Sequence, residues 1–350
     1  MTDAIALAEA SIDRLLQRGD QHDRTWADLQ AAGMFEALLA DEQPFETAAV
    51  LVKVAGRHTA DLPLSGPIIA TWLAHLGGLT DVPRTAGFAL PGTPPTGWLE
   101  RKDGCLVTCG ALRGAPAGPG GLLTVLPCDG VPWVVQIATG PAESAVRNLA
   151  DQPRGSIALD GMTIADGRAA PLPGTASAPL VVAAFLTAAQ MLGAMETCLA
   201  LSTRYAGERQ QFGRPIAQFQ AVQHLCARIA TGVATVRVAV AQAARSLDRG
   251  GGVLAVAIAK SKASEIAEEI AAAAHQIHGA IGFTEEYPLG LFTRRLWSWR
   301  DEFGDETFWN GVVGTAAIGW SGELWSHLVD GAAGTDEDLR RVLDRADLIP

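Results

Sequence analysis

The stretch "RYAGERQQFGRPIAQFQAVQ", residues 204–223, lies between two long alanine-rich stretches and differs from both. It places three arginines, five glutamines and a Phe-Gly pair within twenty residues. Cations suit the last turns of a helix, and a helix expected from about 178 to 207 would deliver Arg209 at its end. Gly213 can adopt the backbone conformation that ends a helix, and Pro215 prevents its simple continuation. We therefore expect a polar corner between two helices.

Such a corner has two interpretations. It can be a solvated surface turn with no ligand. Alternatively, the guanidinium fork of an arginine can bind a phosphate group, while glutamine amides contact neighbouring polar groups of the same ligand. The corner by itself does not decide between them.

The composition limits the class of protein. The chain has 350 residues, 48% of them apolar and 19% charged, which is typical of a globular protein with sizeable cores. A net charge of −11 argues against nucleic-acid binding as the main function. The five cysteines form no Cys-x-x-Cys pair, and the first twenty residues lack the apolar segment of a secretory signal. We therefore expect a cytoplasmic protein.

The texture of the sequence predicts three domains and a tail. Residues 1–84 carry apolar residues at helical spacing, which predicts an N-terminal helical domain. Residues 85–175 are rich in glycine and proline around short β-like runs, which predicts a small β domain. Residues 176–330 return to helical spacing, interrupted at "DRGGG" (248–252), and predict a helical bundle. Residues 331–350 form a tail. The expected fold is mainly α with a small β domain.

One segment is apolar enough to raise the question of a membrane span. Residues 178–195, "APLVVAAFLTAAQMLGAM", contain no charged residue. Their large side chains nevertheless keep to one stripe at helical spacing, and Gln190 lies near the middle. The pattern favours a buried helix of the bundle, so we expect no membrane span.

A second segment, "HQIHGAIGFTEEYPLG" (275–290), contains features that suit ligand binding. Gln276 falls at the end of a predicted helix and is followed by two glycines, the first of which is Gly279. Glycines at such a place let a ligand approach the backbone closely. The two histidines of the segment lie three residues apart, but no third ligand accompanies them, so we expect no metal site.

These two segments, some fifty residues apart, resemble the C-terminal signature pair of the acyl-CoA dehydrogenase family. The resemblance covers nearly the whole chain, because the family has the same order of helical, β and helical domains. It implies oxidation of an acyl-CoA thioester to the enoyl-CoA with FAD, in which a carboxylate removes the α-proton and the β-hydrogen passes to the flavin. It also implies an electron-transfer flavoprotein as the electron acceptor.

The resemblance further implies an FAD that spans two subunits. In the family, one chain holds the flavin ring against its β domain, and its neighbour supplies an arginine, glutamines and a glycine-rich turn to the pyrophosphate and the adenosine. Ala280 replaces a glycine often found in that turn. The positions that match the cofactor-binding residues are Arg209, Gln211, Phe212, Phe219, Gln220, Gln276 and Gly279.

The catalytic base of the family has no direct match in this chain. Family members usually place a glutamate about 25 residues after the glycine-rich turn; here Phe303 takes that position and Gly304 matches the glycine beside it. Glu302 is displaced by one residue and remains the candidate base. Other members place the base in a Glu-Arg pair on the preceding long helix, but those positions fall on Ala183 and Ala184.

The flavin-ring half of the family pattern is also missing. The Thr-Glu-Pro strand start would fall near "FALPG" (88–92), which lacks its polar residues, and "CLVTCGALRG" (105–114) replaces the segment that packs on the flavin ring. We therefore expect a partner subunit without a catalytic base in a heteromeric acyl-CoA dehydrogenase. The resemblance to bacterial relatives of that kind implies fatty acid or steroid side-chain catabolism.

Three other interpretations remain open. The chain could be a self-sufficient homo-oligomeric dehydrogenase that uses Glu302 or a nearby acid as its base. It could be a flavin oxidase or monooxygenase of the same fold. It could also be a flavin-free subunit with a structural or acyl-CoA-binding role.

Overall fold

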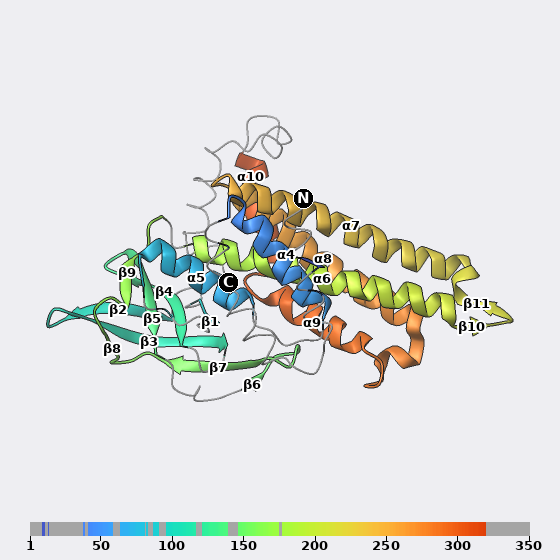
Figure 1. Cartoon of the computed structure of the whole chain (residues 1–350), viewed down its shortest axis with the longest axis horizontal. Helices are drawn as coiled ribbons and strands as arrows, with labels where there is room; N and C mark the ends of the chain where they lie inside the picture. The colour runs from blue at the N-terminus through green and yellow to red at the C-terminus, as the bar shows by residue number, and fades with distance from the viewer. Residues whose placement is uncertain are drawn as a thin grey trace. The chain divides into compact units, whose positions relative to one another are not determined.

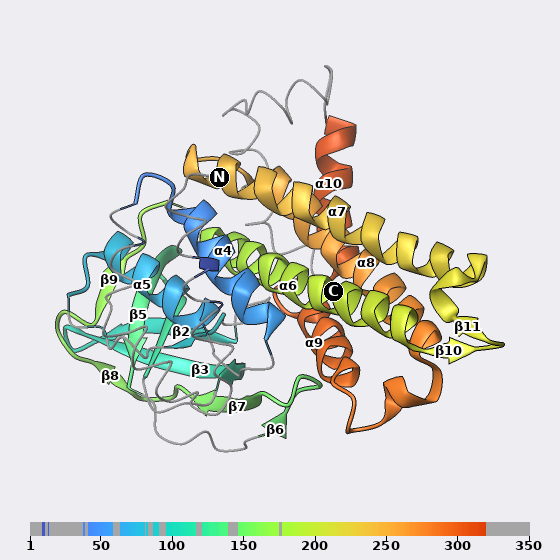
Figure 2. The ribbon, with the colours of Figure 1, turned by 45° about the vertical axis from the view of Figure 1, so that its right-hand side comes forward.

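The computed structural model forms two compact units, a helical unit and a β unit (Figures 1 and 2). The helical unit comprises Met1–Thr25, Glu42–Leu62 and Ala184–Asp336, and the β unit comprises Trp26–Asp41, Pro63–Ala183 and Glu337–Pro350. The structure describes residues 9, 10, 13, 38, 41–58, 64–80, 82, 87–90, 96–116, 121–138, 146–174 and 177–319. Most of the segment before residue 41, expected to be helical, and the tail 331–350 lie outside this range. The domain boundaries expected from the sequence remain a prediction.

The β unit contains two sheets and one described helix. The first sheet has the order β1 (Gly87–Phe88), β4 (Leu122–Cys128), β5 (Val131–Ile137) and β9 (Ala169–Pro171), with only β1 and β4 parallel. The second has the antiparallel order β2 (Gly97–Lys102), β3 (Cys105–Pro116), β7 (Pro153–Ala158) and β6 (Val146–Arg147), and β8 (Thr163–Ile164) pairs with β3. Helix α5 (Ser65–Gly77) belongs to the same unit.

Two Asp-Gly pairs make the tight hairpins of the β unit. Asp103 and Gly104 have φ angles of 49° and 83° between β2 and β3, and Asp129 and Gly130 have 51° and 78° between β4 and β5. Positive φ at both central residues matches the twist of the flanking strands. The strands enclose a core that includes Leu99, Leu112, Leu122, Leu126, Val135, Ile137 and Leu159. These strands agree with the β-like texture of the sequence.

Long helices make up the helical unit. They are α4 (Pro44–Arg57), α6 (Ala178–Glu208, in this unit from Ala184), α7 (Gln220–Asp248), α8 (Val253–His278), α9 (Leu289–Asp301) and α10 (Glu306–Gly319). The 3₁₀ helices η1 (Ile216–Gln218) and η2 (Gly279–Phe283) follow α6 and α8. Between α7 and α8, Gly250 and Gly252 have φ angles of 81° and 108°, which confirms the predicted break at "DRGGG".

Helices α4 and α6 cross with their backbones in contact. A Cβ on Gly56 would lie 2.1 Å from the carbonyl oxygen of Gln190, and one on Gly193 would lie 1.9 Å from that of Lys53. Only glycine fits at either position, because any larger residue would force the helices apart.

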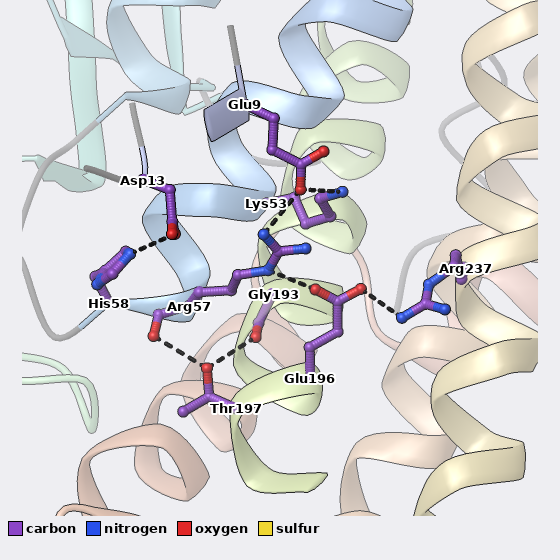
Figure 3. Close-up of polar contacts among 9 residues, drawn as sticks. All are labelled: Glu9, Asp13, Lys53, Arg57, His58, Gly193, Glu196, Thr197 and Arg237. Atoms are coloured by element: carbon purple, nitrogen blue, oxygen red, sulfur yellow. Dashed lines mark hydrogen bonds and ion pairs between the residues drawn. The ribbon is translucent and has the colours of Figure 1, made fainter. Parts of the chain in front are cut away.

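A polar network joins the same crossing to α7 (Figure 3). Arg57 Nε donates to Glu196 Oε2 at 2.6 Å, and Arg237 of α7 donates to the other oxygen of Glu196 at 2.9 Å. Glu9 pairs with both Arg57 and Lys53, at 2.8 and 2.9 Å. Burial alone would lower the pKa of Arg57, but Glu196 and Glu9 raise it above its ordinary value. The network therefore holds three helical segments together by paired charges.

Two helices, α6 and α7, are long and apolar enough to span a membrane by length and composition. The apolar window of α6 is 83% buried within the protein, as expected for a core helix, whereas that of α7 is only 22% buried. The outer face of α7 carries small residues between polar ones, and Val238 on that face is 71% exposed. Among the described residues, the outer face of α7 is therefore an exposed surface of mixed small and polar side chains.

Candidate cofactor site at the end of the helical unit

The polar corner is a short hairpin between α6 and α7. Helix α6 ends at Glu208, and strand β10 (Gln210–Gln211) then pairs antiparallel with β11 (Arg214–Pro215). Phe212 and Gly213 form the turn, with φ angles of 53° and 78°. The predicted end of this helix near residue 207 is confirmed, and Gly213, which has the positive φ angle expected of it, closes the hairpin rather than the helix.

The hairpin presents its side chains to the outside. Arg209 and Gln211 are exposed, and Phe212 is 91% exposed at the tip. Such a large apolar side chain held in water at a positive φ angle is a feature that a ligand or a partner chain would explain. The corner is therefore open rather than folded back onto its own unit.

Phe219 joins the hairpin to the start of α7. It is the N-cap residue of α7, and its ring meets that of Phe212 edge to face at 6.0 Å. The guanidinium of Arg214 lies 4.2 Å from the centre of the Phe219 ring, a cation–π contact. Gln220 follows as the first residue of α7 and is exposed. The predicted residues of this segment thus lie in one continuous corner, together with Arg214, which the sequence did not single out.

The second predicted segment ends α8. Gln276 is exposed in the last turn of the helix, and Gly279 follows it with a φ angle of 62°. Apart from its neighbours in the chain, no described residue has a heavy atom within 4 Å of the place where a Cβ on Gly279 would stand, so the backbone is open on that side. The ring of His275 stacks on that of Phe283 at 4.4 Å, and Phe283 is itself 76% exposed.

An aromatic cluster brings the ends of α6 and α8 together. Tyr205 of α6 stacks on His278 of α8 with ring centres 4.7 Å apart, and Tyr287 meets His278 at 4.9 Å. His278 Nδ1 donates to the carbonyl of Ala274 at 2.7 Å, and its Nε2 lies 3.1 Å from the Tyr287 hydroxyl. Burial lowers the pKa of His278. The hairpin and the glycine-rich turn therefore lie at the same end of the helical unit, where Figures 1 and 2 show β10, β11 and the end of α8.

The two histidines of this segment have structural contacts. His275 Nε2 lies 3.0 Å from the hydroxyl of Thr293, and its Nδ1 is buried without a hydrogen-bond partner among the described residues. Burial, followed by the neighbouring His278, lowers the pKa of His275. In the part of the chain that the structure describes, no group of three His, Cys, Asp or Glu side chains could hold a metal ion.

The position of the expected base lies in a tightly held turn after α9. Glu302 follows the last residue of α9 and is half-buried, and Phe303 and Gly304 have φ angles of 57° and 92°. Trp309 Nε1 donates to the Phe303 carbonyl at 3.0 Å. The resemblance implies two possible positions for the catalytic carboxylate. The first of them is occupied by Phe303, in this turn. The other falls on Ala183 and Ala184, both fully buried.

Comparison with known proteins identifies a known domain in the C-terminal part of this chain. Residues 174–300 match the model of the acyl-CoA dehydrogenase C-terminal domain. Acyl-CoA dehydrogenase IpdE2 of Mycobacterium tuberculosis is 40% identical over 113 residues, 32% of this chain and 34% of that protein. Acyl-CoA dehydrogenase FadE34 of the same organism is 31% identical over 272 residues, 76% of this chain and 36% of that protein. The matches thus span about a third of each of these relatives' length.

Solved structures share the fold. The ChsE4–ChsE5 complex from Mycobacterium tuberculosis superimposes with a TM-score of 0.81 at 19% identity, covering 92% of this chain and 99% of that one. Butyryl-CoA dehydrogenase from Megasphaera elsdenii gives 0.73 at 18% identity, with coverage of 91% and 99%. The expected order of N-terminal helices, middle β domain and C-terminal helices is confirmed. Residues 174–300 are therefore those of an acyl-CoA dehydrogenase C-terminal domain, and the chain shares the fold of butyryl-CoA dehydrogenase.

Proposed function

We propose that this chain is a subunit of an FAD-dependent acyl-CoA dehydrogenase that binds the pyrophosphate and adenosine of FAD but supplies no catalytic base. The substrate is the acyl-CoA thioester of a fatty acid or a steroid side chain, and electrons leave to an electron-transfer flavoprotein. The observation that carries the proposal is the exposed corner at the end of the helical unit, combined with Phe303 in the turn where an acid is expected.

The chemistry of the corner fits a dinucleotide. Arg209 would hold the pyrophosphate through its guanidinium, and the amides of Gln211 and Gln276 suit neighbouring polar groups. The exposed ring of Phe212 offers a stacking surface for a base, and Gly279 leaves room for close backbone approach. When bound, FAD would accept the hydride equivalent from the substrate; the residues named here would bind and orient it.

Assembly with another chain explains why these groups face outward. A cofactor held by the corner of one chain needs the flavin-ring site of a second chain, and the exposed outer face of α7 is a surface for such a partner. One structural neighbour, ChsE4–ChsE5, is described as a complex of two chains, which supports a heteromeric arrangement. We propose a second acyl-CoA dehydrogenase-like chain as the partner, rather than another copy of this one, because the base is missing.

Replacement of Arg209 tests the cofactor assignment. Arg209→Ala in the purified assembly should weaken FAD retention by about tenfold or more, because a charge-assisted contact to phosphate is lost. FAD retention is measured as the ratio of flavin to protein absorbance after dialysis, together with the native mass. Arg228→Ala is the matched control, since Arg228 is also exposed on the helical unit and has only a 3.9 Å contact with Glu269. Equal retention in both variants would contradict the assignment.

A further inference from the structure

Lys260 is a charged residue in the core of the helical unit. Its side chain is fully buried in the first half of α8. The Nζ atom donates to Ser264 Oγ at 3.0 Å and to the carbonyl oxygens of Arg300 and Gly304, both at 2.7 Å. Among the described residues, no carboxylate lies within ion-pair distance of it. When protonated, Lys260 therefore places its three N–H groups on three acceptors, two of them in the backbone of one turn.

Burial of a lysine amine destabilises the folded state unless its hydrogen bonds serve a structural role. Burial lowers the pKa of Lys260 to about 7, while the acidic groups that face it raise that pKa. An apolar side chain of similar length would fill the same space without this desolvation. The role of the N–H groups of Lys260 is therefore to hold the backbone from Arg300 to Gly304. The acidic groups facing Lys260 are Glu302, Asp301, Asp305 and Glu306.

The turn that Lys260 holds has an unusual backbone. Phe303 takes a positive φ angle of 57°, a conformation that costs a residue with a side chain about 1–3 kcal/mol, so surrounding contacts must maintain it. A Cβ on Gly304 would lie 2.6 Å from both Phe308 Cδ1 and Trp309 Nε1, so the turn is pressed against the start of α10. Trp309 and Lys260 donate hydrogen bonds to consecutive carbonyl groups of this turn, those of Phe303 and Gly304.

We propose that Lys260 is a positioning residue, which fixes the 300–304 turn and with it the places of Glu302 and Phe303. The catalytic meaning of the turn rests on the proposed function, since it is there that an acyl-CoA dehydrogenase of this fold is expected to present its base. The position of the turn itself depends only on the contacts described above. With Lys260 in place, the turn keeps one conformation. Its backbone therefore cannot shift by one residue, which is the change that would bring Glu302 to the place of Phe303.

Hydrogen exchange tests this proposal without flavin or turnover. The full chain, in whatever assembly it is purified, is compared with Lys260→Met, which keeps the length of the side chain and removes its donors. Lys262→Met is the matched control, because Lys262 lies two residues away on α8 and pairs only with Glu265 on the surface. Amide exchange is followed by mass spectrometry for peptides covering 300–306 and for peptides within α8.

The expected result is local. In Lys260→Met, exchange of the 300–306 amides should accelerate by about tenfold or more, whereas that of the α8 peptides and of the control variant should not change. Equal protection of the turn in all three proteins would overturn the proposal, as would a uniform acceleration across the helical unit. If Lys260→Met fails to fold, Ser264→Ala removes one acceptor of Lys260 and should accelerate the same peptides less. Since the readout is independent of FAD, its failure leaves the proposed function standing.

Discussion

The polar corner and the turn beside Lys260 use polar side chains in opposite ways. At the corner, Arg209 and Gln211 point outward and Phe212 is almost fully exposed, so the groups with binding chemistry have no partner that would bury them within the described unit. Around Lys260, every donor of the buried ammonium has an acceptor within the same unit. Polar groups that find their hydrogen-bond partners within the same unit stabilise the fold, whereas exposed polar groups are available for a ligand or a second chain.

Under the proposed function, this difference separates the groups that would bind the cofactor from the turn where a base is expected. The groups suited to a neighbour's cofactor remain exposed, while the turn where a base is expected is locked and carries Phe303. Substitutions in the hydrogen-bonded interior should therefore change the stability of the helical unit, and substitutions at the corner should change cofactor retention with little effect on stability.

The largest loss of stability from a single substitution at fixed pH is expected where α4 and α6 touch. Gly193→Ala would place a Cβ 1.9 Å from the Lys53 carbonyl oxygen, so the helices must separate and the polar network of Figure 3 must shift with them. We expect a loss of about 3 kcal/mol in the free energy of unfolding. Gly207→Ala is the control, because that glycine is exposed on the same helix with nothing near its Cβ. Chemical denaturation of both variants checks this, and equal midpoints would disprove the close crossing.

A pH dependence should follow from Lys260. Its pKa is lowered by burial to about 7 from an ordinary 10.5, so between these pH values the unfolded chain binds a proton that the native chain lacks. The free energy of unfolding should therefore rise with pH across this window, by up to about 1.4 kcal/mol per pH unit from this residue. Urea unfolding at several pH values would show a smaller rise for Lys260→Met than for Lys262→Met. Parallel curves for the two variants would mean that Lys260 titrates normally.

A smaller effect is expected in the charged network. Glu196→Gln would leave Arg57 and Arg237 without the carboxylate that both now contact. Because Glu196 is mostly buried, we expect a loss of about 1–3 kcal/mol in the free energy of unfolding. Glu269→Gln is the comparison, since its contact with Arg228 is long and exposed, and it should cost about 0.5 kcal/mol or less. If the two losses were equal, the network would be no stronger than a surface pair.

Much of the fold could be predicted from the sequence. Apolar spacing indicated the long helices, and the glycines of "DRGGG" marked the break between α7 and α8. The hairpin at the corner could not be predicted in this way, because its strands are two residues long and carry no alternation. The helix end near residue 207 was predictable, but the sequence did not show that the positive φ angle of Gly213 serves a hairpin turn.

The interior of the site was harder to predict than its outline. Lys260 stands in an alanine-rich helix, where a lysine usually faces water, and its two backbone acceptors lie 40 and 44 residues further along the chain. The contact between Tyr205 and His278 likewise joins segments far apart in the sequence. Local patterns contain no signal for such pairings. The roles of Arg209, Gln211, Phe212, Phe219, Gln220, Gln276 and Gly279 in cofactor binding remain predictions.

The central claim is that this chain completes an FAD site only together with a different chain. Its most direct test is a flavin absorbance spectrum with the native mass, recorded on this chain alone and after co-expression with a dehydrogenase-like chain encoded beside it. We predict a colourless or poorly assembled protein alone and a yellow mixed oligomer with the partner. A yellow homo-oligomer that oxidises acyl-CoA by itself would contradict the account and make Glu302 the candidate base. A mixed oligomer without flavin would instead indicate a structural or acyl-CoA-binding subunit.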